Sequence, residues 1–288
     1  MKFFVLGATG MVGHAISLYL QEQGHQVITF TRTPFLLTEN IVGDACDLKQ
    51  IKDLINKYQF DAVINCIGIL NQNAEVNKHE AVFINSYIPH YLAYITHGTN
   101  TKIIHLSTDC VFSGQNGNYH ENAIRDGITF YDRSKALGEI DNKKDVTFRN
   151  SIIGPDMKEN GIGLFNWFVK QNGDIAGYSR AIWTGVTTLV LAKAIEKATK
   201  DSLVGLYNLV NNSKISKYEL LMLFNQYFKN NQLTINKCES VIVDKSLINN
   251  RTDFNFVVPS YVDMVIEMKE WIIIHKELYR HYLLDGHT

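Results

Sequence analysis

Short apolar runs alternate with amphipathic stretches through the first half of the chain. The apolar runs are rich in Val, Ile and Phe, and predict strands at residues 3–6, 26–30, 62–66 and 102–106. The amphipathic stretches repeat apolar residues with the period of a helix, and predict helices at residues 12–23, 51–58, 81–97 and 131–140. This alternation predicts an α/β fold, a doubly wound parallel sheet covered by helices on both faces.

After about residue 150 the pattern becomes less regular. Gly154-Pro155, Asn160-Gly161 and Asn172-Gly173 are turn signals between short elements. Further helices are predicted at residues 187–199 and 217–229, and further strands at residues 146–148 and 206–210. We expect a sheet domain at residues 1–150. Residues 151–288 should form mainly a smaller C-terminal lobe that returns some elements to the sheet.

Composition narrows the classes of partner. The chain has 288 residues with 28 basic and 29 acidic side chains, so its net charge gives no general attraction to nucleic acid or membranes. No apolar run approaches the length that spans a membrane. The four cysteines (Cys46, Cys66, Cys110 and Cys238) lack the spacing of a zinc site or a disulfide framework. We therefore expect a cytoplasmic protein with no metal site.

A glycine-rich segment, Gly7-Ala8-Thr9-Gly10-Met11-Val12-Gly13, joins the first predicted strand to the first predicted helix. Glycines at this junction allow a tight turn and let the backbone approach a pyrophosphate, whose charge is stabilised at the helix N-terminus. The segment therefore predicts a dinucleotide-binding loop in the first domain. Its expected cofactor contacts are Gly7, Thr9, Gly10, Met11, Val12 and Gly13.

The end of the second predicted strand bears on the choice of dinucleotide. Thr31-Arg32-Thr33 stands where an acidic residue would bind the ribose 2′-hydroxyl of NAD, and the next acidic residue is Glu39. An arginine at this place accommodates the 2′-phosphate of NADP. Arg32 therefore favours NADP(H), and NAD(H) stays open as the alternative.

Tyr131 and Lys135 stand four residues apart in a predicted helix, so a phenol and an ammonium share one helix face. A phenol titrates near pH 10 and exchanges protons poorly at neutral pH, but a nearby positive charge favours the phenolate. Such pairs are common on helix surfaces. The glycine loop, together with Ser107-Thr108-Asp109 upstream, favours a catalytic interpretation of this one.

Three segments together resemble the extended short-chain dehydrogenases/reductases. They are the GxxGxxG loop at residues 7–13, the run Ser107-Thr108-Asp109-Cys110-Val111-Phe112-Ser113-Gly114, and the run Tyr131-Asp132-Arg133-Ser134-Lys135-Ala136-Leu137-Gly138-Glu139. The resemblance is greatest to the dTDP-4-dehydrorhamnose reductases, the RmlD-like branch, and implies a Rossmann fold. Cys110, Asp132 and the stretch at 180–185 depart from the usual pattern of that branch.

The resemblance implies a role for each matching residue. Tyr131 would protonate a carbonyl oxygen, Lys135 would hold the nicotinamide ribose and lower the pKa of the phenol, and Thr108 would bond the carbonyl. The further implied cofactor contacts are Asp44, Ala45, Cys66 and Gly68. The implied substrate contacts are Ser107, Asn85, Trp183 and Arg251.

The function implied is an NADPH-dependent reductase of a nucleotide-activated 4-keto-6-deoxy sugar, in surface polysaccharide biosynthesis. A nucleotide-sugar epimerase or dehydratase is one alternative, although a dehydratase needs a second acid where Cys110 stands. A non-catalytic dinucleotide-binding regulatory subunit is another. The nucleotide sugar is the expected partner, and the resemblance leaves open whether the protein is a homodimer.

Overall fold

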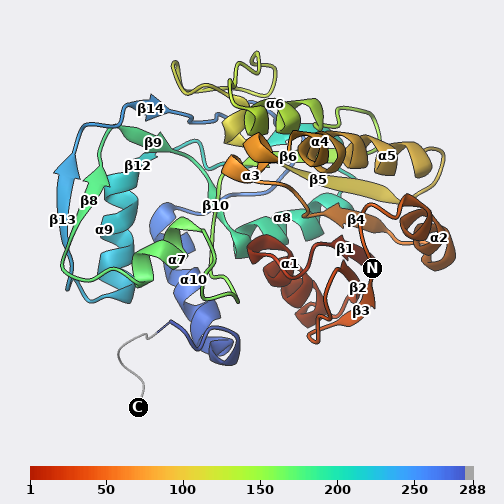
Figure 1. Cartoon of the computed structure of the whole chain (residues 1–288), viewed down its shortest axis with the longest axis horizontal. Coiled ribbons are helices and arrows are strands. Elements are labelled where there is room, and N and C mark those ends of the chain that lie inside the picture. The colour runs from red at the N-terminus through yellow and green to blue at the C-terminus, as the bar shows by residue number, and fades with distance from the viewer. Residues whose placement is uncertain (283–288) are drawn as a thin grey trace.

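A parallel sheet is the centre of the computed structural model, which describes residues 1–282 (Figure 1). The sheet has seven strands in the order β11-β6-β5-β4-β1-β2-β3. The strands are β1 (Lys2–Leu6), β2 (Gln26–Thr31), β3 (Glu39–Val42), β4 (Ala62–Asn65), β5 (Lys102–Thr108), β6 (Val146–Asn150) and β11 (Gly205–Asn208). The strand order reverses between β1 and β4, and such a switch point forms a crevice at the carboxyl ends of the strands.

Helices bury both faces of the sheet, which is why its strands read as continuous apolar runs. On β1, Phe3 and Val5 pack into one hydrophobic core, while Phe4 and Leu6 pack into a second. The first core is shared with α1 (Met11–Glu22) and α8 (Thr188–Lys200), and the second with α2 (Leu48–Tyr58) and α5 (Ile88–Ile95). The predicted doubly wound α/β fold is confirmed.

The helix predicted at residues 81–97 is divided in three. It consists of α4 (Lys78–Ala81), a π-helical segment η1 (Val82–Tyr87) and α5 (Ile88–Ile95). Pro89 lies in the first turn of α5 and has no N–H to donate to the Asn85 carbonyl four residues earlier. The chain widens at that point, as π-helical segments do within α-helices.

Two short elements of the sheet domain escaped the sequence pattern. They are the edge strand β3 and the helix α3 (Asn71–Val76). The sequence of β3 is Glu-Asn-Ile-Val, with no fully buried residue, so it lacks the apolar run that marks the inner strands. In α3 only Ala74 is buried, so no apolar periodicity marks it.

A smaller lobe packs beside the sheet domain, on the left in Figure 1. Its helices are α7 (Leu164–Val169), α9 (Lys217–Phe228) and α10 (Tyr261–Ile274). Aromatic rings fill its core, with the ring centres of Phe165 and Phe228 4.6 Å apart. Its strands are β8 (Asp174–Tyr178) with β13 (Thr234–Cys238), and β9 (Ala181–Trp183) between β12 (Ile215–Ser216) and β14 (Val243–Asp244).

The second half of the chain also returns to the sheet domain. Strand β11 pairs with β6, and α8 covers the sheet beside α1. Between β6 and α8 in the sequence lie β7 (Ile152–Ile153) and β10 (Val186–Thr187), which pair with each other. The functional division at residue 150 stays a prediction. No helix within residues 1–282 is both long enough and apolar enough to cross a membrane.

Candidate active site

The glycine-rich loop makes the tight turn that the sequence predicts. Gly7 has a φ of +87°, in the left-handed region that favours glycine, and its carbonyl accepts a hydrogen bond from the Gly10 N–H at 3.1 Å. A Cβ on Gly13 would lie 2.4 Å from the Gly7 carbonyl oxygen. The loop therefore brings the first turn of α1 against the end of β1, which leaves room for a pyrophosphate at the start of the helix.

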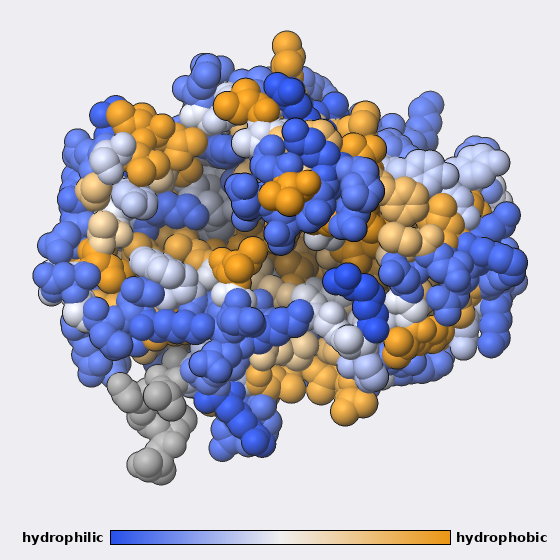
Figure 2. Space-filling view, in the orientation of Figure 1, coloured by the Kyte–Doolittle hydropathy of each residue, from blue (hydrophilic) through white to orange (hydrophobic). Residues whose placement is uncertain are grey.

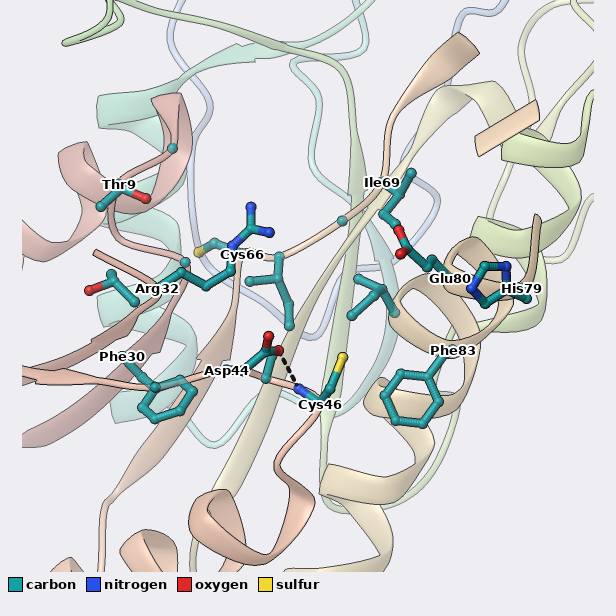
Figure 3. A pocket seen from close by; sticks show the side chains of 18 of the residues that line it. Thr9, Phe30, Arg32, Asp44, Cys46, Cys66, Ile69, His79, Glu80 and Phe83 are labelled. Atoms are coloured by element: carbon teal, nitrogen blue, oxygen red, sulfur yellow. Dashed lines mark hydrogen bonds between the residues drawn. The ribbon is translucent and has the colours of Figure 1, made fainter. Parts of the chain in front are cut away.

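A cavity of about 620 Å³ opens beside this loop, at the carboxyl ends of β1, β2 and β4 (Figure 3). Eight of the predicted cofactor contacts line it: Gly7, Thr9, Gly10, Arg32, Asp44, Ala45, Cys66 and Gly68. Met11, Val12, Gly13 and Lys135 do not line it. The size of the cavity and the close-packed glycine turn at its mouth suit a dinucleotide.

Arg32 and Asp44 reach into this cavity from one side, and His79, Glu80 and Phe83 form the wall opposite (Figure 3). The Asp44 carboxylate accepts a hydrogen bond from the Cys46 N–H at 2.8 Å. Hydrogen bonds from Cys46, and the charge of Arg32, hold the pKa of Asp44 below its usual value. Arg32 lies exposed at the end of β2, with its charge directed into the cavity.

The sequence did not predict the residues of the opposite wall as cavity residues. It also did not predict Lys158, which lines the cavity from the lobe side. Phe83 lies within the helix predicted at residues 81–97, and His79 and Glu80 lie just before it, where the sequence carries no motif. Lys158 follows Pro155 in an irregular loop, and no spacing in the sequence marks it as a cavity residue.

The helix α6 (Phe130–Leu137) carries the Tyr131 and Lys135 side chains. It begins with a reciprocal cap, in which the Thr129 hydroxyl accepts from the Asp132 N–H and the Asp132 carboxylate accepts from the Thr129 N–H, both at 3.1 Å. Asp132, a departure from the family pattern, thus fixes the start of the helix. Both Tyr131 and Lys135 are buried, and Lys135 Nζ donates to the Leu106 carbonyl at 2.6 Å.

Burial sets the ionisation of this pair. It raises the pKa of Tyr131, while a hydrogen bond with Thr108 lowers that pKa by less. Burial prevails, so the phenol stays protonated at neutral pH, and the lowering of its pKa by Lys135 stays a prediction. Burial also lowers the pKa of Lys135 to about 8. A protonated phenol is the form that a proton donor requires.

Lys135 connects the helix to the cavity. The charge of Lys135 acts on the pKa of Cys66, a cavity residue, and burial raises the pKa of that thiol to about 12. Burial also holds the pKa of the neighbouring His105 well below its usual value. Lys135 thus lies close to the cavity residue Cys66, with the Glu139 carboxylate as the main charge acting on it.

Thr108 and Ser107, at the end of β5, face different surroundings. The Thr108 hydroxyl lies beside Tyr131, donates to Asp109 at 3.2 Å and accepts from the Cys110 N–H at 3.1 Å. The buried Ser107 hydroxyl instead donates to Glu139 at 2.6 Å. The structure thus brings Thr108 to the phenol and directs Ser107 behind the helix. Burial raises the pKa of Cys110 to about 12, as expected for a filler rather than a nucleophile.

Glu139 lies just beyond α6 and is the centre of a buried charge network. Its carboxylate accepts two hydrogen bonds from Arg149, at 2.8 and 2.7 Å, and forms an ion pair with Arg125 at 2.5 Å. Arg149 is fully buried on β6 and also donates to Asn208 on β11 at 3.3 Å. The network joins the end of the Tyr131–Lys135 helix to three strands.

Asn85, on η1, joins two other parts of the site. Its amide accepts from the Ile69 N–H at 2.8 Å, donates to the Ile69 carbonyl at 2.9 Å and donates to the Ser134 hydroxyl at 3.0 Å. Ile69 lines the cavity and Ser134 lies on α6. Asn85 thus ties the cavity wall to the helix, a supporting position.

Trp183 and Arg251, as predicted substrate contacts, stay predictions. Trp183 is buried in the lobe, where its ring packs 5.7 Å from that of Tyr261. Arg251 binds Asp253 and donates to the carbonyls of Val204 and Leu206, at 2.7 and 2.9 Å, beside the start of β11. Among residues 1–282 no group of three or more His, Cys, Asp or Glu side chains could hold a metal ion.

Comparison with known proteins shows the family to which the chain belongs. The family described as RmlD substrate binding domain matches residues 1–243. The chain is 32% identical over 143 residues to the probable low-salt glycan biosynthesis reductase Agl14 of Haloferax volcanii, a match that covers 48% of each chain. It is 25% identical over 224 residues to the spore coat polysaccharide biosynthesis protein SpsK of Bacillus subtilis, with 76% of each covered. The match thus spans about half the length of the archaeal relative.

A solved structure shows the same fold. The dTDP-4-dehydrorhamnose reductase of Bacillus anthracis, in complex with NADP, superposes with a TM-score of 0.78 at 20% identity, covering 96% of this chain and all of the other. The sheet order, the glycine loop and the Tyr131–Lys135 helix place this protein in the extended short-chain dehydrogenase/reductase class of oxidoreductases. Within that class, the chain belongs to the RmlD substrate-binding domain family.

Replacing Lys135 by Met tests its ionisation in protein free of dinucleotide. Because the folded pKa of about 8 lies below the ordinary value of 10.5, the unfolded chain binds more protons between these pH values, and wild-type stability rises with pH there. The difference corresponds to about 3 kcal/mol. At each pH, the free energy of unfolding of the Lys135→Met variant, measured in urea, is subtracted from that of the wild type. This difference should increase by up to that amount between pH 7 and pH 10.

The matched control for this prediction is Lys143→Met, which removes an exposed ammonium. Its free energy of unfolding should follow that of the wild type at every pH. A difference between wild type and Lys135→Met that stays constant with pH would contradict the lowered pKa.

Proposed function

We propose that this protein is an NADPH-dependent reductase of a nucleotide-activated 4-keto-6-deoxy sugar, similar to the dTDP-4-dehydrorhamnose reductases. The observation that carries the proposal is the buried, protonated Tyr131 phenol, which lies beside Thr108 and on the same helix face as Lys135. The names of the relatives, a glycan biosynthesis reductase and a dTDP-4-dehydrorhamnose reductase, support a sugar carbonyl as the acceptor.

NADPH, when bound along the cavity, supplies the hydride that reduces the carbonyl carbon. The Tyr131 hydroxyl gives its proton to the carbonyl oxygen, so that the product is an alcohol and the side chain is left as a phenolate. The Thr108 hydroxyl donates a hydrogen bond to the same oxygen. Solvent then returns a proton to Tyr131.

Lys135 contributes charge and position to this reaction. One of its three N–H donors is used by the Leu106 carbonyl, which leaves two for the hydroxyls of the nicotinamide ribose. Its positive charge stabilises the Tyr131 phenolate during turnover, and burial strengthens that interaction.

The alternatives fit the site less well. A dehydratase requires two acids beside Thr108, but Asp109 is followed by Cys110, and burial raises the pKa of the Asp109 carboxyl. A regulatory subunit has no need of a proton donor, whereas Tyr131, Lys135 and Thr108 are all present and adjacent. We further propose a cytoplasmic location and a role in polysaccharide synthesis, and leave the homodimer as a prediction.

The first test is turnover. Purified protein mixed with NADPH and dTDP-4-keto-L-rhamnose, or with other nucleotide-linked 4-keto-6-deoxy sugars, should oxidise NADPH, followed at its near-ultraviolet absorbance. The same mixture without the keto sugar should show no oxidation. Silence across the whole panel of keto sugars would refute the proposed reaction.

Tyr131→Phe should lower kcat by about 10²–10⁴-fold, because it removes the proton donor and little else. NADPH affinity, measured by fluorescence titration, should change little. Tyr94→Phe is the matched control, since Tyr94 is exposed on α5 and its loss should leave turnover intact. A Tyr131→Phe enzyme with near wild-type kcat would remove Tyr131 from its assigned role.

Arg32→Ala should weaken NADPH binding by about tenfold and NADH binding by much less, because only NADPH carries the 2′-phosphate. Arg280→Ala, which removes a surface arginine paired with Glu277, should change neither affinity. Titration calorimetry of the three proteins with both cofactors measures the difference. Equal losses for NADPH and NADH would remove the basis for the cofactor preference.

A further inference from the structure

Two lysines of the lobe, Lys217 and Lys245, each follow an outer strand of one small sheet. Lys217 directly follows β12, and Lys245 directly follows β14. These strands flank β9, and both Ser216 and Asp244 pair with Ile182. Because β12 runs antiparallel and β14 parallel to β9, the two lysines lie on either side of β9 and continue toward its opposite ends.

Both lysines act on the turn that carries Thr108. Their charges lower the pKa of Asp109, the residue after Thr108, against the larger effect of burial. The loop beyond this turn packs on β14, where the Asp244 N–H donates to the Gly114 carbonyl at 2.8 Å. Figure 2, in the orientation of Figure 1, shows the surface hollowed between the part of the lobe that holds β9 and the part of the sheet domain that holds α6.

Neither ammonium has a carboxylate within 4.0 Å among residues 1–282, whereas nearby Lys214 pairs with Asp244 at 2.8 Å. The other acids around the two lysines are bonded elsewhere. Glu219 accepts from Ser216 in a helix cap, and Asp126 accepts from Ser113 at 2.6 Å. The two charges are therefore available to an anion.

The position of Lys217 is electrostatically costly for the folded protein. It is the first residue of α9, where the positive end of the helix dipole disfavours a cation. The residue is also half-buried, and burial lowers the pKa of its ammonium. The buried Asp109 offsets this cost only in part, since burial still lowers the pKa of Lys217, and a bound anion would offset the rest.

We propose that Lys217 and Lys245 bind the diphosphate of the nucleotide-sugar substrate. The inference rests on the proposed function and adds the residues that hold the substrate. In such a sugar the diphosphate is attached at C1, across the ring from the C4 carbonyl. With C4 at Tyr131 and Thr108, the phosphates extend across the hollow toward the lobe. Arg251, the phosphate ligand implied by the sequence resemblance, is occupied beside the start of β11.

Titration calorimetry with dTDP and UDP as probes tests this proposal. The cofactor cavity is first saturated with NADP⁺, so that the probes report on the substrate site. Lys217→Met and Lys245→Met should each weaken diphosphate binding by about tenfold or more, and together by more than either alone. Thymidine and uridine, which lack phosphates, should bind the variants and the wild type alike.

Two controls separate lost charge from lost structure. Lys217→Arg and Lys245→Arg keep the charge and should bind within a few-fold of wild type, and Lys237→Met, an exposed lysine of β13, should bind as wild type. Unchanged Tm and NADP⁺ affinity establish that each variant is folded. The affinity of the wild-type protein for dTDP and UDP should also fall as the NaCl concentration is raised, and this measurement needs no variant.

Wild-type affinity in both methionine variants, or no diphosphate binding by the wild-type protein, would overturn the proposal. The result is separate from the test of the reaction. If the protein reduces the keto sugar and neither methionine variant changes the KM, the proposed function stands and the proposed diphosphate site is refuted. Lysine-dependent diphosphate binding without turnover would keep this site and refute the proposed reaction.

Discussion

The buried carboxylate of Glu139 fixes the geometry on which the site depends. It joins the end of the Tyr131–Lys135 helix to Ser107 on β5 and Arg149 on β6, and Arg149 continues to Asn208 on β11. A buried ion pair adds little net stability over apolar packing, but loss of one partner costs several kcal/mol. The network therefore acts mainly as a constraint: the helix cannot shift along the sheet without leaving a charge uncompensated.

The environment around Lys135 gives its charge an unusual reach. Tyr131, Cys66 and His105 are all buried, and burial shifts each pKa toward the neutral form. Bulk water does not screen the buried Lys135 ammonium, and the Glu139 carboxylate is the main charge that acts on it. Lys135 is thus the cation nearest the proposed reaction, whereas Arg32 and Lys158 line the cofactor cavity. The electrostatics of this site therefore depend on the neutral state of Tyr131, Cys66 and His105 as well as on the charge of Lys135.

Local patterns predicted most of the sheet domain, because a strand, a glycine turn and a helix cap are each specified within a few residues. The dinucleotide loop and the Tyr131–Lys135 pair are of this kind. Long-range packing decided what the sequence missed. The resemblance implies a substrate contact for Arg251, but the sequence does not show its partners, Asp253 and the carbonyls of Val204 and Leu206. Trp183 became core because Tyr261, far along the chain, covers it. The exposed edge strand β3 carried no apolar signal.

The place of β11 in the sheet has a consequence for how the chain folds. This strand pairs with β6, yet α7, α8 and the short strands β7, β8, β9 and β10 lie between them in the sequence. During synthesis β6 remains an open edge until residue 208 has emerged, and unpaired edges invite pairing with other chains. The closure of such a long loop also slows folding. Because β11 joins the sheet last, the sheet domain and the lobe elements that precede β11 fold as one unit. A growing chain should depend most on chaperones until β11 has been synthesised.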